Sequence, residues 1–419
     1  MLIEITEWIN EMFGKLPGTG LLNYISFRAG VAMVLSLIIS MLFGKRIIDK
    51  LRRLQVGETV RELGLEGQKQ KEGTPTMGGL IIILAILVPS LIMARLDNVY
   101  IILMLLATIW MGFIGFMDDY IKVFKNNKKG LKGRTKLLGQ LGLGLIIAVT
   151  MLVHKDVVVE MSTEEAVELG ISEARVSDVV VNGKVIKGKG NYKTGLTNIP
   201  FVKGNNLDYS KILSDKDSSR MGWWAWLIFV PLVVVIVMAV SNGANLTDGL
   251  DGLATGVSGI IGATLGVLAY VSGNAIAANY LNILHLPGAG ELVIYAACFV
   301  GATIGFLWYN SFPASIFMGD TGSLTLGGII AALAIVLRKE LLIPVLCGVF
   351  LMENLSVMLQ VAYFKYTKKK YGEGRRIFKM SPLHHHYQKL GMAETKIVTR
   401  FWIVGILLAV LTIITLKVR

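Results

Sequence analysis

The chain has 419 residues, of which 53% are hydrophobic and only 17% are charged. Soluble domains carry about 25% charged residues, so this composition excludes a soluble, a disordered or a collagen-like protein and indicates one that crosses a membrane. Basic residues outnumber acidic ones by 13, and both cysteines, Cys298 and Cys347, lie in apolar stretches, so no disulfide framework is expected.

Residues 1–20 are predicted to form an amphipathic helix on the outer surface of the membrane. Apolar residues, among them Ile5, Trp8 and Met12, recur there at helical spacing. Three glutamates stand where a signal peptide would have basic residues, which argues against a cleaved leader. A frayed terminus is the alternative.

Ten apolar segments approach the roughly 20 residues that a helix needs to cross a bilayer. They are residues 22–43, 77–95, 99–117, 137–153, 223–241, 253–272, 290–309, 323–337, 341–364 and 398–416. We therefore expect an all-α integral membrane protein of about ten transmembrane helices, with four helices in residues 21–153 and six in residues 223–419.

The loops after the first, third and ninth predicted spans are strongly basic. Residues 44–74, 119–136 and 365–396 together carry 24 basic and 8 acidic residues, whereas the long segment 154–222 carries 10 of each. Because loops rich in lysine and arginine stay in the cytoplasm, we place these three loops inside and both termini outside.

Residues 154–222 are expected to form a small extramembrane insertion on the periplasmic side, with a β-hairpin. The run 179–186 is apolar around an Asn-Gly pair at 182–183, a strong turn signal. Ser162 with Glu165 matches a helix capping box. Nothing in this segment suggests catalysis, so we expect it to leave the chemistry unchanged.

Two adjacent aspartates, Asp118 and Asp119, lie at the inner end of the third predicted span. Carboxylates beside lipid are costly without a cation or a proton, and neighbouring helical residues point about 100° apart, so the two cannot have identical roles. Asp320 lies near the start of the eighth span, where a helix N-terminus also suits phosphate. These residues predict a metal or acid–base site; a solvated helix end and a plain helix cap are the alternatives.

Two further polar runs fall on the same side of the membrane. In Ser241–Gly252, the residues Asn245, Asp248 and Asp251 would share one face if helical, and the glycines allow a ligand close to the backbone. Three consecutive histidines at 384–386 suit hydrogen bonds to phosphate from a non-helical loop better than joint ligation of one metal.

Glycine-rich residues 71–79 lead into the second span. Lys71 there, and Lys122 after the aspartate pair, lie beside motifs and are the basic residues that we expect to bind substrate. Ordinary positive-inside charge or contact with anionic lipid explains most of the remaining lysines. Glu353, inside the ninth span, is a functional candidate by its position, although packing against Asn354 or a neighbouring span explains it equally well.

Several aspartates among basic residues indicate Mg²⁺ and phosphate groups. The chain has no GxxxxGK[ST] motif, which excludes a P-loop ATPase. A reaction that breaks one pyrophosphate and makes another needs no ATP. Two unit charges 4 Å apart repel by roughly 4 kcal/mol at an effective dielectric constant of 20, and Mg²⁺, lysine and histidine would offset that repulsion between reacting anions.

Five strings occur in the order GTPTMGG, DDYIK, NGANLTDGLDGLA, FMGDTGS and PLHHHY. Together they resemble the phospho-N-acetylmuramoyl-pentapeptide transferase branch of the polyprenyl-phosphate N-acetylhexosamine-1-phosphate transferases, over residues 20–153 and 221–419. Many members of that family have only a short loop in place of 154–222. The resemblance implies a magnesium-dependent, homodimeric enzyme of a bacterial inner membrane with a kinked ninth helix and a groove for a prenyl chain.

The resemblance implies a reaction at the cytoplasmic face. Undecaprenyl phosphate would attack UDP-MurNAc-pentapeptide, giving lipid I and UMP in peptidoglycan synthesis. Asp320 would hold the metal near Asp118 and Asp119, and one of that pair, with Asp118 the better candidate, would be the base. A phosphate monoester is already mostly dianionic at pH 7, which weakens the need for a base.

The same resemblance implies a set of substrate contacts, with Phe317 stacking on uracil. The nucleotide would bind Lys71, Asn245, Asp248, Gly249, Leu250, Asp251 and Phe317, and the other substrate residues would be Thr76, Lys122, Lys136, Asn242, Asn310, Gln360, His384, His385 and His386. The bilayer is an expected partner and nucleic acid is not.

Two other functions remain as alternatives. A sister transferase would use UDP-N-acetylglucosamine, but the PLHHHY string is similar to the muramoyl branch, and competition between the two nucleotides would separate them. A secondary transporter would place ionisable groups near the bilayer midplane in repeated halves, whereas here the aspartates of the polar motifs lie at the cytoplasmic ends of the predicted spans and no repeat is visible.

Overall fold

The computed structural model describes residues 2–14, 18–54, 73–125, 127, 129–171, 174–181, 184–202, 204–212 and 223–417. Its helices are α1 (Leu2–Phe13), α2 (Ile25–Arg53), α3 (Gly79–Met93), α4 (Val99–Phe124), α5 (Gly133–Val153), α6 (Thr163–Glu168), α7 (Trp223–Thr247), α8 (Leu253–Ser272), α9 (Ala275–Leu281), α10 (Leu292–Asn310), α11 (Gly319–Val336), α12 (Ile343–Leu346), α13 (Gly348–Tyr371), α14 (Leu383–Lys389) and α15 (Glu394–Thr415). Short 3-10 helices are η1 (Thr19–Asn23), η4 (Tyr209–Lys211), η5 (Ala289–Glu291) and η6 (Glu340–Leu342), and the strands are β1 (Val159–Ser162), β2 (Arg175–Val181), β3 (Lys184–Tyr192), β4 (Leu196–Asn198) and β5 (Asn206–Asp208).

All ten apolar segments predicted as spans fall on helices, but not all of these helices are full spans. Within the described ranges, eight helices are long and apolar enough to cross a membrane, namely α2, α4, α5, α7, α8, α10, α11 and α15. A ninth span is broken, because Glu340–Leu346 and Gly348–Tyr371 meet at a bend of 75°. The segment predicted as the second span is α3, which is apolar but only 15 residues long. The predicted count of ten therefore exceeds the eight or nine spans that meet the length criterion.

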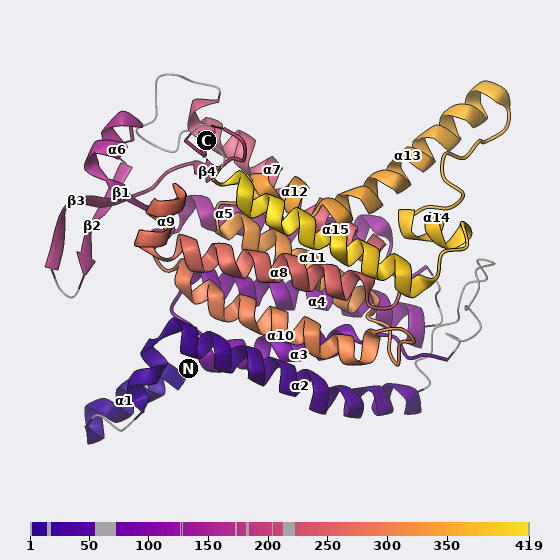
Figure 1. Cartoon of the computed structure of the whole chain (residues 1–419), viewed down its shortest axis with the longest axis horizontal. Coiled ribbons are helices and arrows are strands. Elements are labelled where there is room, and N and C mark those ends of the chain that lie inside the picture. The colour runs from indigo at the N-terminus through magenta and orange to yellow at the C-terminus, as the bar shows by residue number, and fades with distance from the viewer. Residues whose placement is uncertain are drawn as a thin grey trace.

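The long helices pack closely because small residues line their contacts. A Cβ added to Gly301 of α10 would lie 2.5 Å from the carbonyl oxygen of Met33 in α2, and one added to Gly305 would lie 2.6 Å from Cβ of Ser40. Small residues let helix backbones approach inside a membrane, where packing and not the hydrophobic effect drives association. In α11, 89% of the residues are buried, so this helix forms the centre of the bundle (Figure 1).

The two ends of the bundle differ. Both termini, α6, α9 and the strands lie at one end, and α14 with the outer half of α13 lies at the other (Figure 1). Strands β1, β3 and β2 form an antiparallel sheet in that order, and β4 pairs with β5. The predicted hairpin is confirmed, since Val181 of β2 pairs with Lys184 of β3, while the Asn182–Gly183 turn lies outside the described residues.

Two smaller predictions also concern this end. The Ser162 side chain accepts a hydrogen bond from the Glu165 backbone at 3.1 Å, which confirms the predicted cap of α6. The N-terminal segment is helical over α1, with Trp8 57% and Met12 61% exposed, so an apolar face is open; its contact with a membrane surface stays a prediction.

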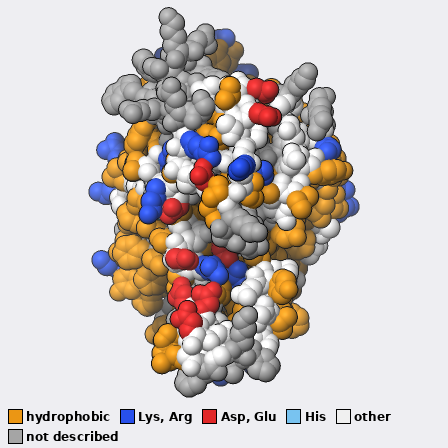
Figure 2. Space-filling model, turned by 90° about the vertical axis from the view of Figure 1, so that its left-hand side faces the viewer, with side chains coloured by type: hydrophobic (Ala, Val, Ile, Leu, Met, Phe, Trp, Pro, Cys, Tyr) orange, Lys and Arg blue, Asp and Glu red, His pale blue; other side chains and the backbone are white. Residues whose placement is uncertain are grey.

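The insertion is joined to the bundle more closely than the sequence suggested. Arg338, Lys339 and Glu340, between α11 and α12, are all buried beneath it. Asn198 accepts a hydrogen bond from Lys339, and the Tyr209 hydroxyl donates to Glu340 at 2.8 Å. Figure 2 shows acidic and basic side chains intermingled over this end of the molecule. The insertion therefore covers three charges at the end of the central helix.

Candidate active site

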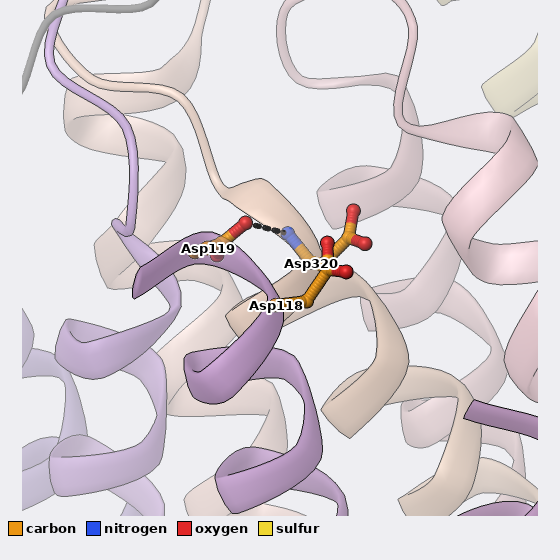
Figure 3. Close-up of side chains that lie close together, drawn as sticks. All are labelled: Asp118, Asp119 and Asp320. Carbon is orange, nitrogen blue, oxygen red and sulfur yellow. Dashed lines mark hydrogen bonds between the residues drawn. The ribbon is translucent and has the colours of Figure 1, made fainter. Parts of the chain in front are cut away.

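Three aspartates from two helices meet at the end of the bundle opposite to the strands. Asp118 and Asp119 lie near the end of α4, and Asp320 lies in the first turn of α11. One carboxylate oxygen of each lies within 4.8 Å of the others (Figure 3). Asp118 and Asp119 are buried, and the side chain of Asp320 is 14% exposed. Of these three side chains, Asp320 is therefore the one that is open to solvent.

Glycines allow the backbones that carry these aspartates to approach. A Cβ added to Gly115, one turn before the aspartate pair, would lie 2.6 Å from Cα of Thr321 in α11. A Cβ on Gly79, at the start of α3, would lie 2.5 Å from the carbonyl carbon of Thr321. Gly319 has φ +70°, and a Cβ there would lie 2.5 Å from Oδ2 of Asp119. The glycines of the GTPTMGG, GFMDD and FMGDTGS segments thus set the spacing of α3, α4 and α11.

Asp119 caps the start of α11 from the neighbouring helix. Its carboxylate accepts hydrogen bonds from Asp320 N at 3.1 Å, Thr321 N at 2.8 Å and Thr321 Oγ1 at 2.6 Å. Met318, at the N-cap position of α11, supplies no side-chain hydrogen bond. The first amides of a helix need such acceptors and favour a negative charge. Asp119 is thus turned toward the backbone, away from the carboxylates of Asp118 and Asp320 (Figure 3).

Asp118 and Asp320 share two lysines. Lys122 Nζ lies 2.6 Å from Asp118 and 3.2 Å from Asp320, and Lys136 of α5 lies 3.0 Å from Asp118 and also contacts Asp320. Asp118 accepts a further hydrogen bond from Leu131 N at 2.7 Å. Burying two like charges together requires such cations.

The donor set suits a hard divalent cation. Three carboxylates face two lysines, so one negative charge is left uncompensated within this cluster. Oxygen ligands at a partly open position are what Mg²⁺ prefers, since it keeps several waters or phosphate oxygens. Asp118 and Asp320 have oxygens directed at each other, whereas Asp119 already accepts three hydrogen bonds from protein donors. The three carboxylates can hold a metal ion, and Asp118 and Asp320 are better placed as ligands than Asp119.

The polar run 241–252 meets this cluster at Asn245. Asn245 Nδ2 donates to Asp320 Oδ1 at 2.9 Å and to Ser323 Oγ at 2.8 Å, which brings α7 to the site. Helix α7 ends at Thr247, so Asp248 and Asp251 lie in the following turn and do not continue a helical face with Asn245. The Asp251 carboxylate accepts from Ala314 N at 3.0 Å.

Three amides that the sequence suggested as substrate contacts have partners inside the protein. Asn310 accepts from Gly252 N at 3.1 Å and from Thr255 Oγ1 at 2.9 Å. Gln360 makes three hydrogen bonds of 3.0 Å to the backbone of residues 377–378. Asn242 exchanges hydrogen bonds with Gln140. These amides hold loops and helices in place around the site.

The remaining expected contacts differ in exposure. Thr76 is 7% and Leu250 4% exposed, so both are packed, while Phe317 is half-buried. The Phe317 backbone pairs with the segment before α3, donating to Pro75 O at 2.8 Å. Lys71 lies outside the described residues.

The prediction of a non-helical loop for the three histidines is wrong, because residues 383–389 form α14 after Pro382. In a helix, consecutive side chains point in different directions, and here each has its own surroundings. His384 is fully buried with Nδ1 3.2 Å from Glu353 Oε2. His385 bonds to Gln388, and His386 accepts from Lys379 N at 3.1 Å.

Two residues of the site were missed by the sequence reading. Thr321 binds Asp119 through its hydroxyl and its amide, and Gln140 links α5 to Asn242 and to Ser241 Oγ, 3.1 Å away. The position of Thr321 within the FMGDTGS string was the available signal. Gln140 stands alone in an apolar helix, where a buried amide needs a partner.

Comparison with known proteins gives concordant matches. A family profile described as Glycosyl transferase family 4 matches residues 101–338, and one described as Phospho-N-acetylmuramoyl-pentapeptide-transferase signature 1 matches residues 71–83. The chain is 57% identical to the phospho-N-acetylmuramoyl-pentapeptide-transferase of Parabacteroides distasonis, 58% identical to that of Flavobacterium psychrophilum and 55% identical to that of Flavobacterium johnsoniae. Each match covers 100% of both chains, so it extends through the segment 154–222, which the motif-based resemblance left out.

Proposed function

Because the chain belongs to the phospho-N-acetylmuramoyl-pentapeptide transferase family, we infer that the three-aspartate cluster is its reaction site. The enzyme transfers phospho-MurNAc-pentapeptide from UDP-MurNAc-pentapeptide to undecaprenyl phosphate, which gives lipid I and UMP in peptidoglycan synthesis. It is a multi-pass membrane protein. The convergence of Asp118, Asp119 and Asp320 is the observation that supports this assignment of the reaction site.

We propose that Asp118 and Asp320 hold Mg²⁺ and that Asp119 positions them. When bound, Mg²⁺ would neutralise charge on the phosphate oxygens and draw the two anionic substrates together. Lys122 and Lys136 lie against the same two carboxylates, so they can turn to phosphate oxygens and offset charge in the transition state.

The acceptor phosphate requires little help to lose a proton. The second pKa of a phosphate monoester is about 6, so the acceptor is mostly dianionic at neutral pH. Asp119 is a poor candidate for a base because its oxygens accept three hydrogen bonds from α11. We therefore assign the aspartates to binding and positioning, and orientation of the two substrates carries much of the rate enhancement.

We propose that the turn 248–252, with Asn245 and Phe317, binds the uridine nucleotide. The support is its place beside Asp320 and its exposed Gly249, which allows close approach of a ligand. We further propose that this end of the bundle faces the cytoplasm of a bacterial inner membrane, because loops 119–136 and 365–396 are strongly basic. A homodimer, implied only by the family resemblance, is part of the same proposal.

The decisive experiment measures UMP release by the purified protein with undecaprenyl phosphate and Mg²⁺. UDP-MurNAc-pentapeptide and UDP-N-acetylglucosamine are supplied in parallel, with Asp320→Asn as the inactive reference. We expect turnover of the muramoyl nucleotide only, and its near-complete loss in the variant. Turnover of the other nucleotide alone would refute the assigned substrate.

Binding of Mn²⁺, followed by electron paramagnetic resonance, tests the metal assignment without turnover. Asp320→Asn and Asp118→Asn should each weaken Mn²⁺ binding at least tenfold, about the effect of removing one of two charged ligands. Unchanged Mn²⁺ binding in a folded Asp320→Asn protein would remove this residue from the metal site.

A further inference from the structure

A carboxylate inside the bent span and a histidine form a buried pair beside the active site. Glu353 of α13 and His384 of α14 are both fully buried, with His384 Nδ1 3.2 Å from Glu353 Oε2. No group in the described part of the chain forms a hydrogen bond of normal geometry with the Glu353 carboxylate oxygens or the His384 ring nitrogens, so each of the two side chains is buried with the other as its close polar neighbour. Burying a carboxylate and an imidazole together is seldom more stabilising than burying apolar residues of the same size, so their presence calls for a role other than stability.

The other side of the His384 ring lies against the turn between α7 and α8. A Cβ added to Gly249 would lie 2.8 Å from Cε1 of His384 and closer still to Nε2. The imidazole is therefore in direct contact with the backbone of the turn, and a side chain at position 249 would displace one or the other.

The turn is held at its far side by groups from other elements. Gly252 N donates to Asn310 Oδ1 at 3.1 Å, and Asp251 N donates to Glu394 Oε1 at 2.9 Å. On the side of α14, the support is the His384 ring. The orientation of the His384 ring therefore determines where this side of the turn is supported.

We propose that Glu353 is a positioning residue: it orients His384 beneath the 248–252 turn and so sets where Asp248 and Asp251 meet the nucleotide. The proposal rests on the proposed function, which assigns this turn to the uridine nucleotide. Because its Oε2 atom lies 3.2 Å from Nδ1, the carboxylate limits the rotation of the ring. Because the ring is enclosed on all sides, His384 acts through the turn and does not touch the phosphates.

The test compares the kinetics of three variants of the full chain. Glu353→Leu removes the acceptor, Glu353→Gln keeps an oxygen acceptor in the same place, and Ser356→Ala is the matched control. Ser356 is buried in the same helix and donates to the backbone carbonyl of Glu353 at 2.7 Å, a contact that does not involve the Glu353 carboxylate. Glu353→Leu removes the carboxylate that lies against the His384 ring, so it should raise the KM for UDP-MurNAc-pentapeptide about tenfold and leave the KM for undecaprenyl phosphate unchanged. Glu353→Gln and Ser356→Ala should stay within about threefold of the unmodified protein.

Gly249→Ala changes the same contact between the turn and the His384 ring, but from the side of the turn. It therefore provides a second test if Glu353→Leu fails to fold. Its added methyl group would meet the His384 ring, and it should raise the same KM. Equilibrium binding of UMP, measured by calorimetry, should weaken in parallel, because UMP probes the nucleotide pocket without turnover.

Two results would overturn the proposal: an unchanged nucleotide KM in folded Glu353→Leu or Gly249→Ala protein, or a fall in kcat alone, which a general structural defect would produce. Absence of turnover in the unmodified protein would instead overturn the proposed function.

Discussion

The spacing between α4 and α11 should control activity, and one methyl group tests it. In Gly115→Ala, the new Cβ would lie 2.6 Å from Cα of Thr321, against a backbone that cannot rotate away. Carbon atoms in contact lie about 3.5–4.0 Å apart, so the helices must separate by roughly 1 Å. A displacement of that size between reacting groups costs about 100-fold in rate. We therefore expect kcat to fall about 100-fold, which corresponds to about 2.7 kcal/mol of transition-state stabilisation.

Gly112→Ala, one turn earlier in the same helix, is the matched control. Its Cβ would lie 2.7 Å from Cδ1 of Ile83, the tip of a flexible side chain, and 3.5 Å from the next atoms. Both substitutions raise helix propensity by about 1 kcal/mol, so that contribution cancels in the comparison. UMP release is measured for both proteins, with thermal unfolding in detergent to establish folding. If Gly115→Ala turns over within threefold of Gly112→Ala, the backbone contact does not set the geometry of the site.

Three shorter predictions follow from other buried polar contacts, each measured by thermal unfolding. Thr321→Val removes the 2.6 Å hydrogen bond to Asp119 and should cost about 1.5–3 kcal/mol; an unchanged unfolding temperature would contradict the cap. Arg28→Met removes the cation 2.6 Å from buried Glu291, which keeps only a backbone hydrogen bond from Arg95 among the described residues, and should cost about 3–5 kcal/mol of unfolding free energy. Most of this cost should be recovered in Arg28→Met/Glu291→Leu, and no recovery would contradict this reasoning. Burial lowers the pKa of Lys339 to about 7, whereas its pKa in the unfolded chain is about 10.4. Between these two pH values the unfolded state binds more protons, so the free energy of unfolding should rise with pH. A rise that persists in Lys339→Met would have another source.

Hydropathy predicted the helices well because an apolar segment inside a membrane must form the hydrogen bonds of its backbone within itself. It failed on completeness of the spans: α3 ends after 15 residues, and the ninth segment is broken by 75° between Leu346 and Gly348. Neither the length of a helix within an apolar run nor the angle of a break is set by composition, since both depend on neighbouring helices.

The aspartates were predictable as a group, but their individual roles were not. A carboxylate at a span end must meet a cation, so Asp118, Asp119 and Asp320 stood out in the sequence. That Asp119 caps α11 follows from the approach of two helices, 200 residues apart in sequence, which local spacing does not encode. Asn310 and Gln360 were expected to bind substrate because the family resemblance implied it, and in the structure their amides support loops; an amide that supports a loop has the same sequence signal as one that binds a ligand.

The central helix connects the insertion with the chemistry. One end of α11 is capped by Asp119 and carries Asp320, and the other continues into Arg338 and Lys339, which the insertion buries. Sliding α11 along its axis would break the hydrogen bonds that its first amides donate to Asp119. It would at the same time expose the charges under the insertion. Each end thus opposes movement of the other, across a helix of 18 residues or about 27 Å. We therefore expect the insertion, through its contacts with Arg338 and Lys339, to stabilise the axial position of α11, whose other end carries Asp320.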